Sequence, residues 1–221
     1  MSKYTIEFIK SIVQINNTIY DYGCGPGLYT SLLQKEGFKV TGIDVSKRSL
    51  KYAKESNKSV EYLEMNYVTD KSPKIFNFAM MIYCDFGALD PHSQVKVLKN
   101  IRDSLSNEGL FFFDVMSHNF FDNQIEREIT YDEIDGFFMS GKSNITSKFV
   151  KYSKQGLLLP HYHAFGHKEV NYYNRDKCFD EKEMETLLNR NGIQIINTYS
   201  NTFGDKDFSN SDTISFLCVK K

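Results

Sequence analysis

The feature that most constrains the fold is a short apolar run that ends in three alternating glycines. The stretch IYDYGCGPGLYT, residues 19–30, places Gly23, Gly25 and Gly27 between a strand-like and a helix-like segment. Glycine adopts positive φ readily and lets a ligand approach the backbone closely. This pattern predicts a strand, a tight loop and a helix N-terminus, the arrangement that binds nucleotide-like ligands at the carboxyl edge of a parallel sheet.

The rest of the chain alternates between strand and helix patterns. Apolar runs typical of buried parallel strands lie at 18–22, 38–44, 60–65, 76–83 and 109–115. Helical spacing of apolar residues predicts helices at 4–15, 27–36, 47–56, 95–105 and 180–192, and two strands follow at 193–199 and 213–219. Ser46 and Asp180 are expected to cap two of these helices. The alternation predicts one α/β domain over residues 1–221.

The alternation breaks after residue 116. Residues 130–175 are rich in Tyr, Phe and Thr, contain short alternating stretches such as ITSKFVKY, and have no strong helix pattern. We interpret this segment as an inserted antiparallel β cap over the acceptor pocket.

Charge and cysteine usage limit the partners and the compartment. Lys plus Arg number 27 and Asp plus Glu 28, so no net positive field favours nucleic acid or an anionic membrane. The four cysteines form no CxxC pair, and no apolar run reaches membrane-spanning length. We therefore expect a cytoplasmic protein without a nucleic-acid or membrane partner.

The spacing of the loop argues against a dinucleotide. A third glycine of the G-x-G-x-x-G fingerprint would fall at 28, where the chain has Leu28, and a nicotinamide oxidoreductase is disfavoured for this reason. The phosphate loop G-x-x-x-x-G-K-[ST] is also absent from the sequence. Asp21, just before the loop, would repel a diphosphate and would suit an ammonium group.

Two further strand ends supply the remaining contacts. Asp44 follows Gly23 by 21 residues, where a carboxylate can accept hydrogen bonds from a ribose diol. Asn66 and Tyr67 end the third strand, where a side-chain amide and a backbone N–H can meet an adenine edge. An amino acid, a ribose and an adenine in line describe S-adenosylmethionine.

These residues resemble the motifs of the class I S-adenosylmethionine-dependent methyltransferases, and the resemblance covers essentially the whole chain. It implies a Rossmann-like α/β fold, with a seven-stranded mostly parallel sheet, helices on both faces and an antiparallel last strand. It also implies a set of cofactor contacts: Asp21, Tyr22, Gly23, Cys24, Gly25, Gly27, Asp44, Val45, Asn66, Tyr67, Ile82 and Tyr83. The chain departs from the family pattern at Asn66 and Asn77, which replace commoner aspartates.

Methyl transfer from a sulfonium mainly requires that the acceptor be aligned and water excluded, so a dedicated base is optional. We expect the acceptor, a small molecule, at the end of the fourth strand, and no catalytic residue is assigned. The candidates for its pocket are Asp85, Phe86, Tyr162 and His163. Asp85 either takes a proton or holds a cationic amine, or it caps the turn before Pro91.

Several alternatives are weighed against this function. The tetrapeptide [DN]-P-P-[YFW] of base N-methyltransferases is absent, Cys84 is interpreted as a core residue, and the neutral charge disfavours RNA over a small molecule. His161, His163 and His167 share one parity, but no acid or cysteine completes a metal set, so no metal is expected. A protein acceptor and a non-catalytic cofactor-binding module stay open.

Overall fold

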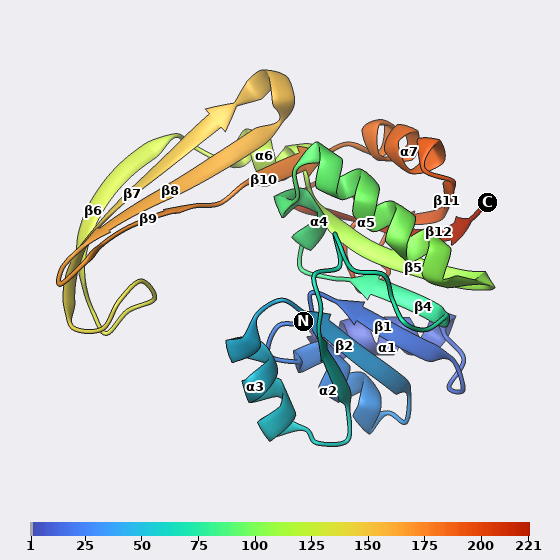
Figure 1. Cartoon of the computed structure of the whole chain (residues 1–221). Helices are drawn as coiled ribbons and strands as arrows, with labels where there is room; N and C mark the ends of the chain where they lie inside the picture. The colour runs from blue at the N-terminus through green and yellow to red at the C-terminus, as the bar shows by residue number, and fades with distance from the viewer. Residues whose placement is uncertain (1) are drawn as a thin grey trace.

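A central sheet of seven strands forms the body of the molecule in the computed structural model, which describes residues 2–221 (Figure 1). The strand order is β3-β2-β1-β4-β5-β12-β11, and β12 is antiparallel to both of its neighbours. The strands are β1 (Thr18–Tyr22), β2 (Lys39–Asp44), β3 (Glu61–Glu64), β4 (Phe76–Met81), β5 (Leu105–Ser117), β11 (Ile193–Tyr199) and β12 (Thr213–Lys220). The predicted mostly parallel sheet with an antiparallel last strand is confirmed.

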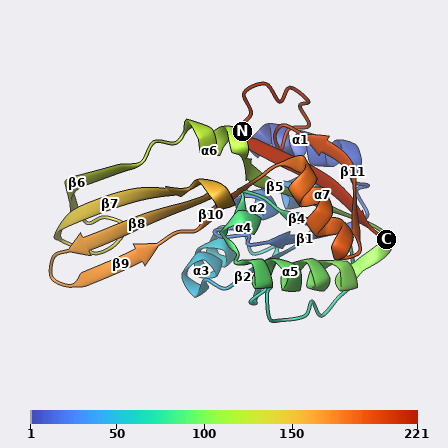
Figure 2. The same cartoon turned by 90° about the horizontal axis from the view of Figure 1, so that it is seen from above.

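Helices cover both faces of this sheet (Figure 2). The helices are α1 (Ser2–Ile12), α2 (Leu28–Lys35), α3 (Lys47–Ser56), α4 (Asp85–Ala88), α5 (Pro91–Ser104), α6 (His118–Asn123) and α7 (Glu181–Arg190). Apolar side chains of α1 and α2 pack on one face of the sheet, and those of α5 and α7 pack on the other. Phe78 and Phe113, on neighbouring strands, lie in these two separate clusters and are fully buried, which contributes about 1.5–3 kcal/mol for each side chain.

The predicted helix caps are present. The Ser46 hydroxyl accepts a hydrogen bond from the Ser49 N–H at 3.2 Å, and the Asp180 carboxylate accepts one from the Glu183 N–H at 2.7 Å. Each cap satisfies one of the backbone donors that a helix N-terminus leaves unpaired. These contacts fix where α3 and α7 begin.

A second, smaller sheet extends from β5 and projects away from the body (Figure 1). Its antiparallel strands are β6 (Arg127–Ile134), β7 (Lys142–Tyr152), β8 (Leu157–Phe165) and β9 (Glu169–Tyr173), and we call these four strands the arm. The single turn η1 (Ser153–Gln155) joins β7 to β8. The strand β10 (Asp176–Phe179) connects the arm to the body, because it pairs with β8 and, in parallel, with the end of β5.

The structure moves some predicted boundaries. The antiparallel insertion begins at residue 127 rather than 130, and β5 covers 105–117 rather than 109–115. The longer β5 has a physical reason, because Met116 pairs with both β12 and β10 and so keeps the strand extended. No helix within residues 2–221 has the length and the apolar character needed to cross a membrane.

Candidate active site

The glycine loop lies at the carboxyl end of β1 with all three glycines at positive φ. The φ angles are 72° at Gly23, 52° at Gly25 and 80° at Gly27. A β-carbon on Gly23 would overlap the Asp85 carboxylate, so a larger residue there would both displace Asp85 and adopt an unfavourable positive φ. Apart from Gly25 and its two chain neighbours, no residue of 2–221 has an atom within 4 Å of the place that a β-carbon on Gly25 would take. Gly25 therefore leaves a space above the loop that the protein does not fill.

Asp44, at the end of β2, borders this space. One carboxylate oxygen accepts a hydrogen bond from the Gly25 N–H at 2.8 Å, and the other accepts from the Ser46 N–H at 2.7 Å. A carboxylate offers about four acceptor sites, so each oxygen can still accept a further hydroxyl. The loop thus orients Asp44 for a diol ligand.

Asp21 lies beneath the loop rather than at its surface. The side chain is buried, and its carboxylate accepts a hydrogen bond from the Thr30 hydroxyl at 2.7 Å. Burial, helped by the neighbouring Asp85 and Asp44, raises the pKa of Asp21 to about 7, although the hydrogen bond from Thr30 lowers it. Asp21 therefore links the end of β1 to α2, which carries Thr30.

Asp85 is turned toward the glycine loop. The Tyr67 hydroxyl donates a hydrogen bond to its carboxylate at 3.1 Å. Burial raises the pKa of Asp85 to about 6, although the hydrogen bond from Tyr67 lowers it. The turn before Pro91 is capped by Asp90, which accepts from the backbone of the next residues, so of the two predicted roles the capping one does not belong to Asp85.

Two consecutive residues after β4 adopt left-handed backbone conformations that side chains seldom take. Tyr83 has φ 87° and Cys84 has φ 61°. The buried carboxylate of Asp114, on β5, accepts hydrogen bonds from both backbone N–H groups, at 2.8 Å and 3.0 Å. The Tyr83 side chain is left 81% exposed at the sheet edge. Strain of this kind occurs at functional sites when the surroundings enforce it.

Sequence reasoning missed Asp114 and Tyr29. The signal for Asp114 was an acid inside the apolar run FFFDV, since a buried acid needs partners. Tyr29, in the first turn of α2, is half-buried, and burial raises its pKa. The neighbouring Asp114 and Tyr83 also raise this pKa, and a hydrogen bond with Thr5 lowers it. These residues border the sheet edge next to the glycine loop.

Several predicted contacts do not reach this edge with their side chains. Cys24 packs against α3, and Ile82 packs in the cluster under α1 and α2. Phe86 is fully buried against Phe113 and Phe179 and so offers no surface to an acceptor, which corrects its assignment as a pocket residue.

Of the other predicted residues, Val45 and Asn66 are exposed and Tyr22 is buried. Val45 is exposed after β2, and the Tyr22 ring is buried beneath the Tyr67 ring at 6.1 Å between centroids. The Asn66 side-chain oxygen accepts from the Val68 N–H at 3.0 Å, and Asn66 itself is exposed. Cys84, expected in the core, is only half-buried, because the left-handed turn holds its thiol near Asp114.

Tyr162 and His163 lie on opposite faces of the arm, as their parity predicts. Tyr162 packs near Phe138 at 5.5 Å between ring centroids, while His163 pairs with Glu169 at 2.8 Å. His161 stacks on Tyr173. No group of three or more His, Cys, Asp or Glu side chains in residues 2–221 is arranged to hold a metal ion.

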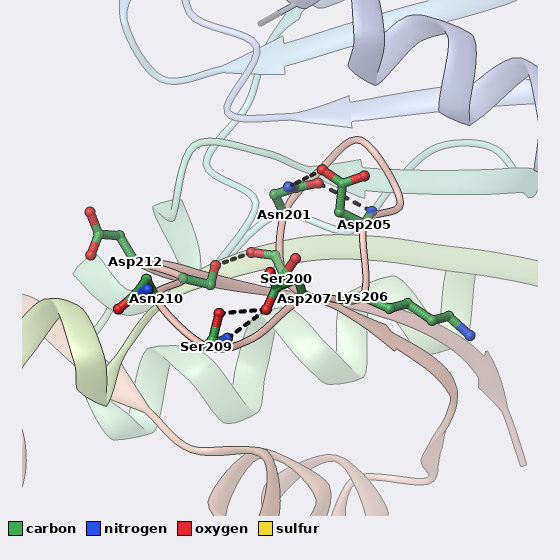
Figure 3. Close-up of a pocket in the computed structure, with 9 residues that line it drawn as sticks. Ser200, Asn201, Asp205, Lys206, Asp207, Ser209, Asn210 and Asp212 are labelled. Atoms are coloured by element: carbon green, nitrogen blue, oxygen red, sulfur yellow. Dashed lines mark hydrogen bonds between the residues drawn. The ribbon is translucent and has the colours of Figure 1, made fainter.

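A polar hollow lies in the β11–β12 loop (Figure 3). Its lining includes Asn201 and Asp205, whose side chains hydrogen-bond each other at 2.8 Å. Ser117, at the end of β5, donates a hydrogen bond to the Ser211 carbonyl at 2.6 Å. The loop is therefore anchored at the same carboxyl edge of the sheet as the glycine loop.

Comparison with known proteins agrees with this geometry. Residues 19–109 match a family model described as a methyltransferase domain. A ubiquinone biosynthesis O-methyltransferase of Idiomarina loihiensis is 28% identical over 107 residues, which are 46% of this chain and 43% of that protein. A putative methyltransferase of a Geobacillus species is 33% identical over 105 residues, 45% of this chain and 42% of that protein. The matched part thus spans less than half the length of these relatives.

The fold likeness extends further along the chain. A crystal structure of an S-adenosylmethionine-dependent methyltransferase from Clostridium acetobutylicum superposes with a TM-score of 0.78 and 16% identity, covering 99% of this chain and 90% of that one. This likeness includes the arm as well as the body. Residues 19–109 thus match a methyltransferase domain, and the chain as a whole shares the fold of an S-adenosylmethionine-dependent methyltransferase of known structure.

Proposed function

We propose that this protein binds S-adenosylmethionine at the glycine loop and transfers its methyl group to a small-molecule acceptor by in-line displacement. One observation carries the proposal. Asp44 is fixed by the Gly25 and Ser46 N–H groups at the border of the space that Gly25 leaves open. A carboxylate in this position, beside a loop of this family, suits a ribose diol.

The surrounding residues fit the other parts of the cofactor. The segment at Asn66 and Tyr67 would lie along the adenine edge, and the acids Asp21 and Asp85 would face the ammonium and sulfonium charges. Burial raises the pKa values of Asp21 and Asp85 to about 7 and about 6. A cationic ligand beside them would lower these pKa values, because it favours the charged forms of the acids. When bound, the cofactor supplies an electrophilic methyl group on sulfur.

The acceptor would lie next to Tyr83, where Asp114 holds the strained turn open to solvent. A small molecule is supported by the balanced charge of the chain, 27 basic against 28 acidic residues, and by the similarity to a ubiquinone biosynthesis O-methyltransferase. The turn would align the acceptor with the methyl group, which is the main demand of this reaction. Four free cysteines support a reducing, cytoplasmic setting.

Calorimetry with S-adenosylmethionine and S-adenosylhomocysteine tests the proposal. Wild-type protein should bind both, and Asp44→Ala should lose about 2–4 kcal/mol of binding free energy, because hydrogen bonds to a charged group contribute about 1.5–3 kcal/mol each. Asp103→Ala, an exposed acid on α5, serves as the matched control and should bind normally. Wild-type affinity in Asp44→Ala would exclude the ribose assignment.

A second assay separates an enzyme from a binding module. Turnover is measured with a panel of small hydroxyl, amine and thiol acceptors, an RNA and a protein extract. Methylation of a small molecule supports the proposal, and methylation of RNA or protein alone contradicts its acceptor class. Tight cofactor binding without any turnover indicates a non-catalytic module.

A further inference from the structure

The outer strand of the arm presents a long unpaired edge. Strand β6 has eight residues and pairs only with β7 among the strands of residues 2–221. It lies on the side of the arm away from α3 (Figure 2). An exposed edge offers a row of free backbone N–H and C=O groups to another strand, and proteins usually protect or use such an edge.

The two faces of the arm differ in character. On one face, Tyr131 continues a cross-strand row with Ile145, Ala164 and Val170. Ile145 and Ala164 pack with Met139 in a small buried cluster. This row ends at the free edge, where Ile129 is 47% exposed and Tyr131 is 40% exposed. An apolar row that stops at an unpaired edge can be continued by another strand on the same face.

The charges on β6 divide into paired and unpaired groups. On the polar face, Glu128 and Asp132 form ion pairs with Lys148 and Lys142 of β7. On the apolar face, Arg127 and Glu133 stand at the two ends of the exposed row. One Glu133 carboxylate oxygen is buried without a hydrogen-bond partner anywhere in residues 2–221. The unpaired charges of β6 are therefore of opposite sign and flank its apolar centre.

The order of charged and apolar residues along β6 is complementary to that of a second copy of β6 that runs antiparallel to it. In an antiparallel pair, two directly opposed residues either both direct their backbone N–H and C=O groups toward the other strand or both direct them away. Two copies of β6 can therefore pair only when odd-numbered residues oppose odd-numbered ones and even-numbered residues oppose even-numbered ones. With Thr130 at the centre, Arg127 opposes Glu133 of the second copy, and Ile129 opposes Tyr131 of the second copy. The like charges that oppose each other, Glu128 and Asp132, are already neutralised by lysines of their own chain.

We propose that β6 is a homodimer interface, in which two copies of the chain pair antiparallel about Thr130 to form one continuous sheet from two arms. The pairing satisfies both free edges, joins the two apolar rows and gives four flanking charges two ion pairs. Opposite charges and aromatic to β-branched contacts are the pairs that stabilise neighbouring strands.

A charge-swap experiment tests this interface with the full-length protein. Sedimentation velocity should show wild-type dimers, and R127E or E133R alone should raise the dimer dissociation constant at least about tenfold, because each variant places like charges opposite at two positions. Mixing R127E with E133R should restore dimers, since both pairs are then of opposite sign in the heterodimer. The double variant R127E/E133R should also dimerise. Glu185→Arg, on the exposed face of α7, is the control and should stay dimeric.

Hydrogen exchange gives a reading that does not depend on the variants. Amides of residues 127–134 should exchange more slowly at high than at low wild-type concentration. A wild-type monomer, or dimers that both single variants retain, would overturn the proposal. The proposal would also be overturned if mixing R127E with E133R does not restore dimers and hydrogen exchange does not depend on concentration. The charges of β6 would then protect the edge strand from pairing.

Discussion

The carboxyl edge of the body and the arm differ in how strongly the surrounding structure constrains the backbone. At the edge, buried acids hold backbone N–H groups in place, and three glycines and two other residues adopt left-handed conformations. The arm has a small buried cluster around Ile145 and a second one around Leu158 where it joins the body, and its polar contacts are mostly between neighbouring strands. The body therefore has the more constrained backbone, which is where we propose that the cofactor binds, and the arm is where we propose that the acceptor is selected and two copies pair.

A valine at Gly25 should have the largest effect. Gly25→Val fills the space that the loop leaves open, so we expect loss of cofactor binding with a folded circular dichroism spectrum. Gly141→Val is a matched control on the arm, because Gly141 also has positive φ and no neighbour of residues 2–221 within 4 Å of its absent β-carbon. Both variants should lose similar stability by thermal melting, and only Gly25→Val should lose binding. Equal binding by both variants would contradict the assignment of the loop.

The next effect concerns the strained turn. Asp114→Asn keeps an acceptor for the Tyr83 and Cys84 N–H groups but removes its charge, so we expect a loss of about 1 kcal/mol in the free energy of unfolding. Turnover should fall about tenfold or more, because small displacements of positioned groups have large effects on rate. Urea unfolding and steady-state kinetics measure the two quantities. Unchanged turnover in a destabilised variant would assign Asp114 a purely structural role.

Most of the body could be predicted because its signals are local. Apolar runs and cap residues such as Ser46 determine strands and helices over short stretches, and the loop spacing favours one ligand over another. The side-chain directions at the site could not be predicted in this way. Phe86 and Asp85 are adjacent, yet one enters the core and the other faces Gly23, because the left-handed turn before α4 redirects the chain. That turn depends on Asp114, about 30 residues away, and no local pattern reveals such a contact.

A smaller effect should appear in the pH dependence of cofactor binding. The folded-state pKa values of Asp21 and Asp85 are about 7 and about 6, above their ordinary value of 3.8. At pH values between the ordinary and the folded-state pKa, the folded protein therefore binds more protons than the unfolded chain. These acids therefore lower stability as pH rises from about 4 to about 7. A sulfonium ligand favours the ionised acids, so its affinity should increase over the upper part of this range.

The two cofactor forms provide the control for this effect. S-adenosylhomocysteine lacks the sulfonium charge, so its affinity should change less between roughly pH 5.5 and pH 8 than that of S-adenosylmethionine. The ratio of the two affinities, measured by calorimetry, should rise several-fold. In Asp85→Asn the rise should be smaller. A ratio that stays constant in the wild type would show that the sulfonium does not lie near these acids.

The smallest effects on cofactor binding should come from the arm. Tyr162→Ala and His163→Ala change opposite faces of β8, so only one of them should affect an acceptor. We expect Tyr162→Ala to lower turnover more, because Tyr162 lies on the face that carries Phe138. Cofactor affinity should be nearly unchanged in both variants. Loss of cofactor binding in both would mean that the arm belongs to the cofactor site.

Hydrogen exchange of the wild-type protein with and without S-adenosylhomocysteine tests the central claim most directly. Peptides that contain the glycine loop, Asp44, Tyr67 and the turn at Tyr83 should exchange more slowly with ligand, because these segments surround the proposed site. Peptides from β6 to β9 should exchange at the same rate at a fixed protein concentration. Protection confined to the arm, or no protection of the glycine loop at saturating ligand, would contradict the account.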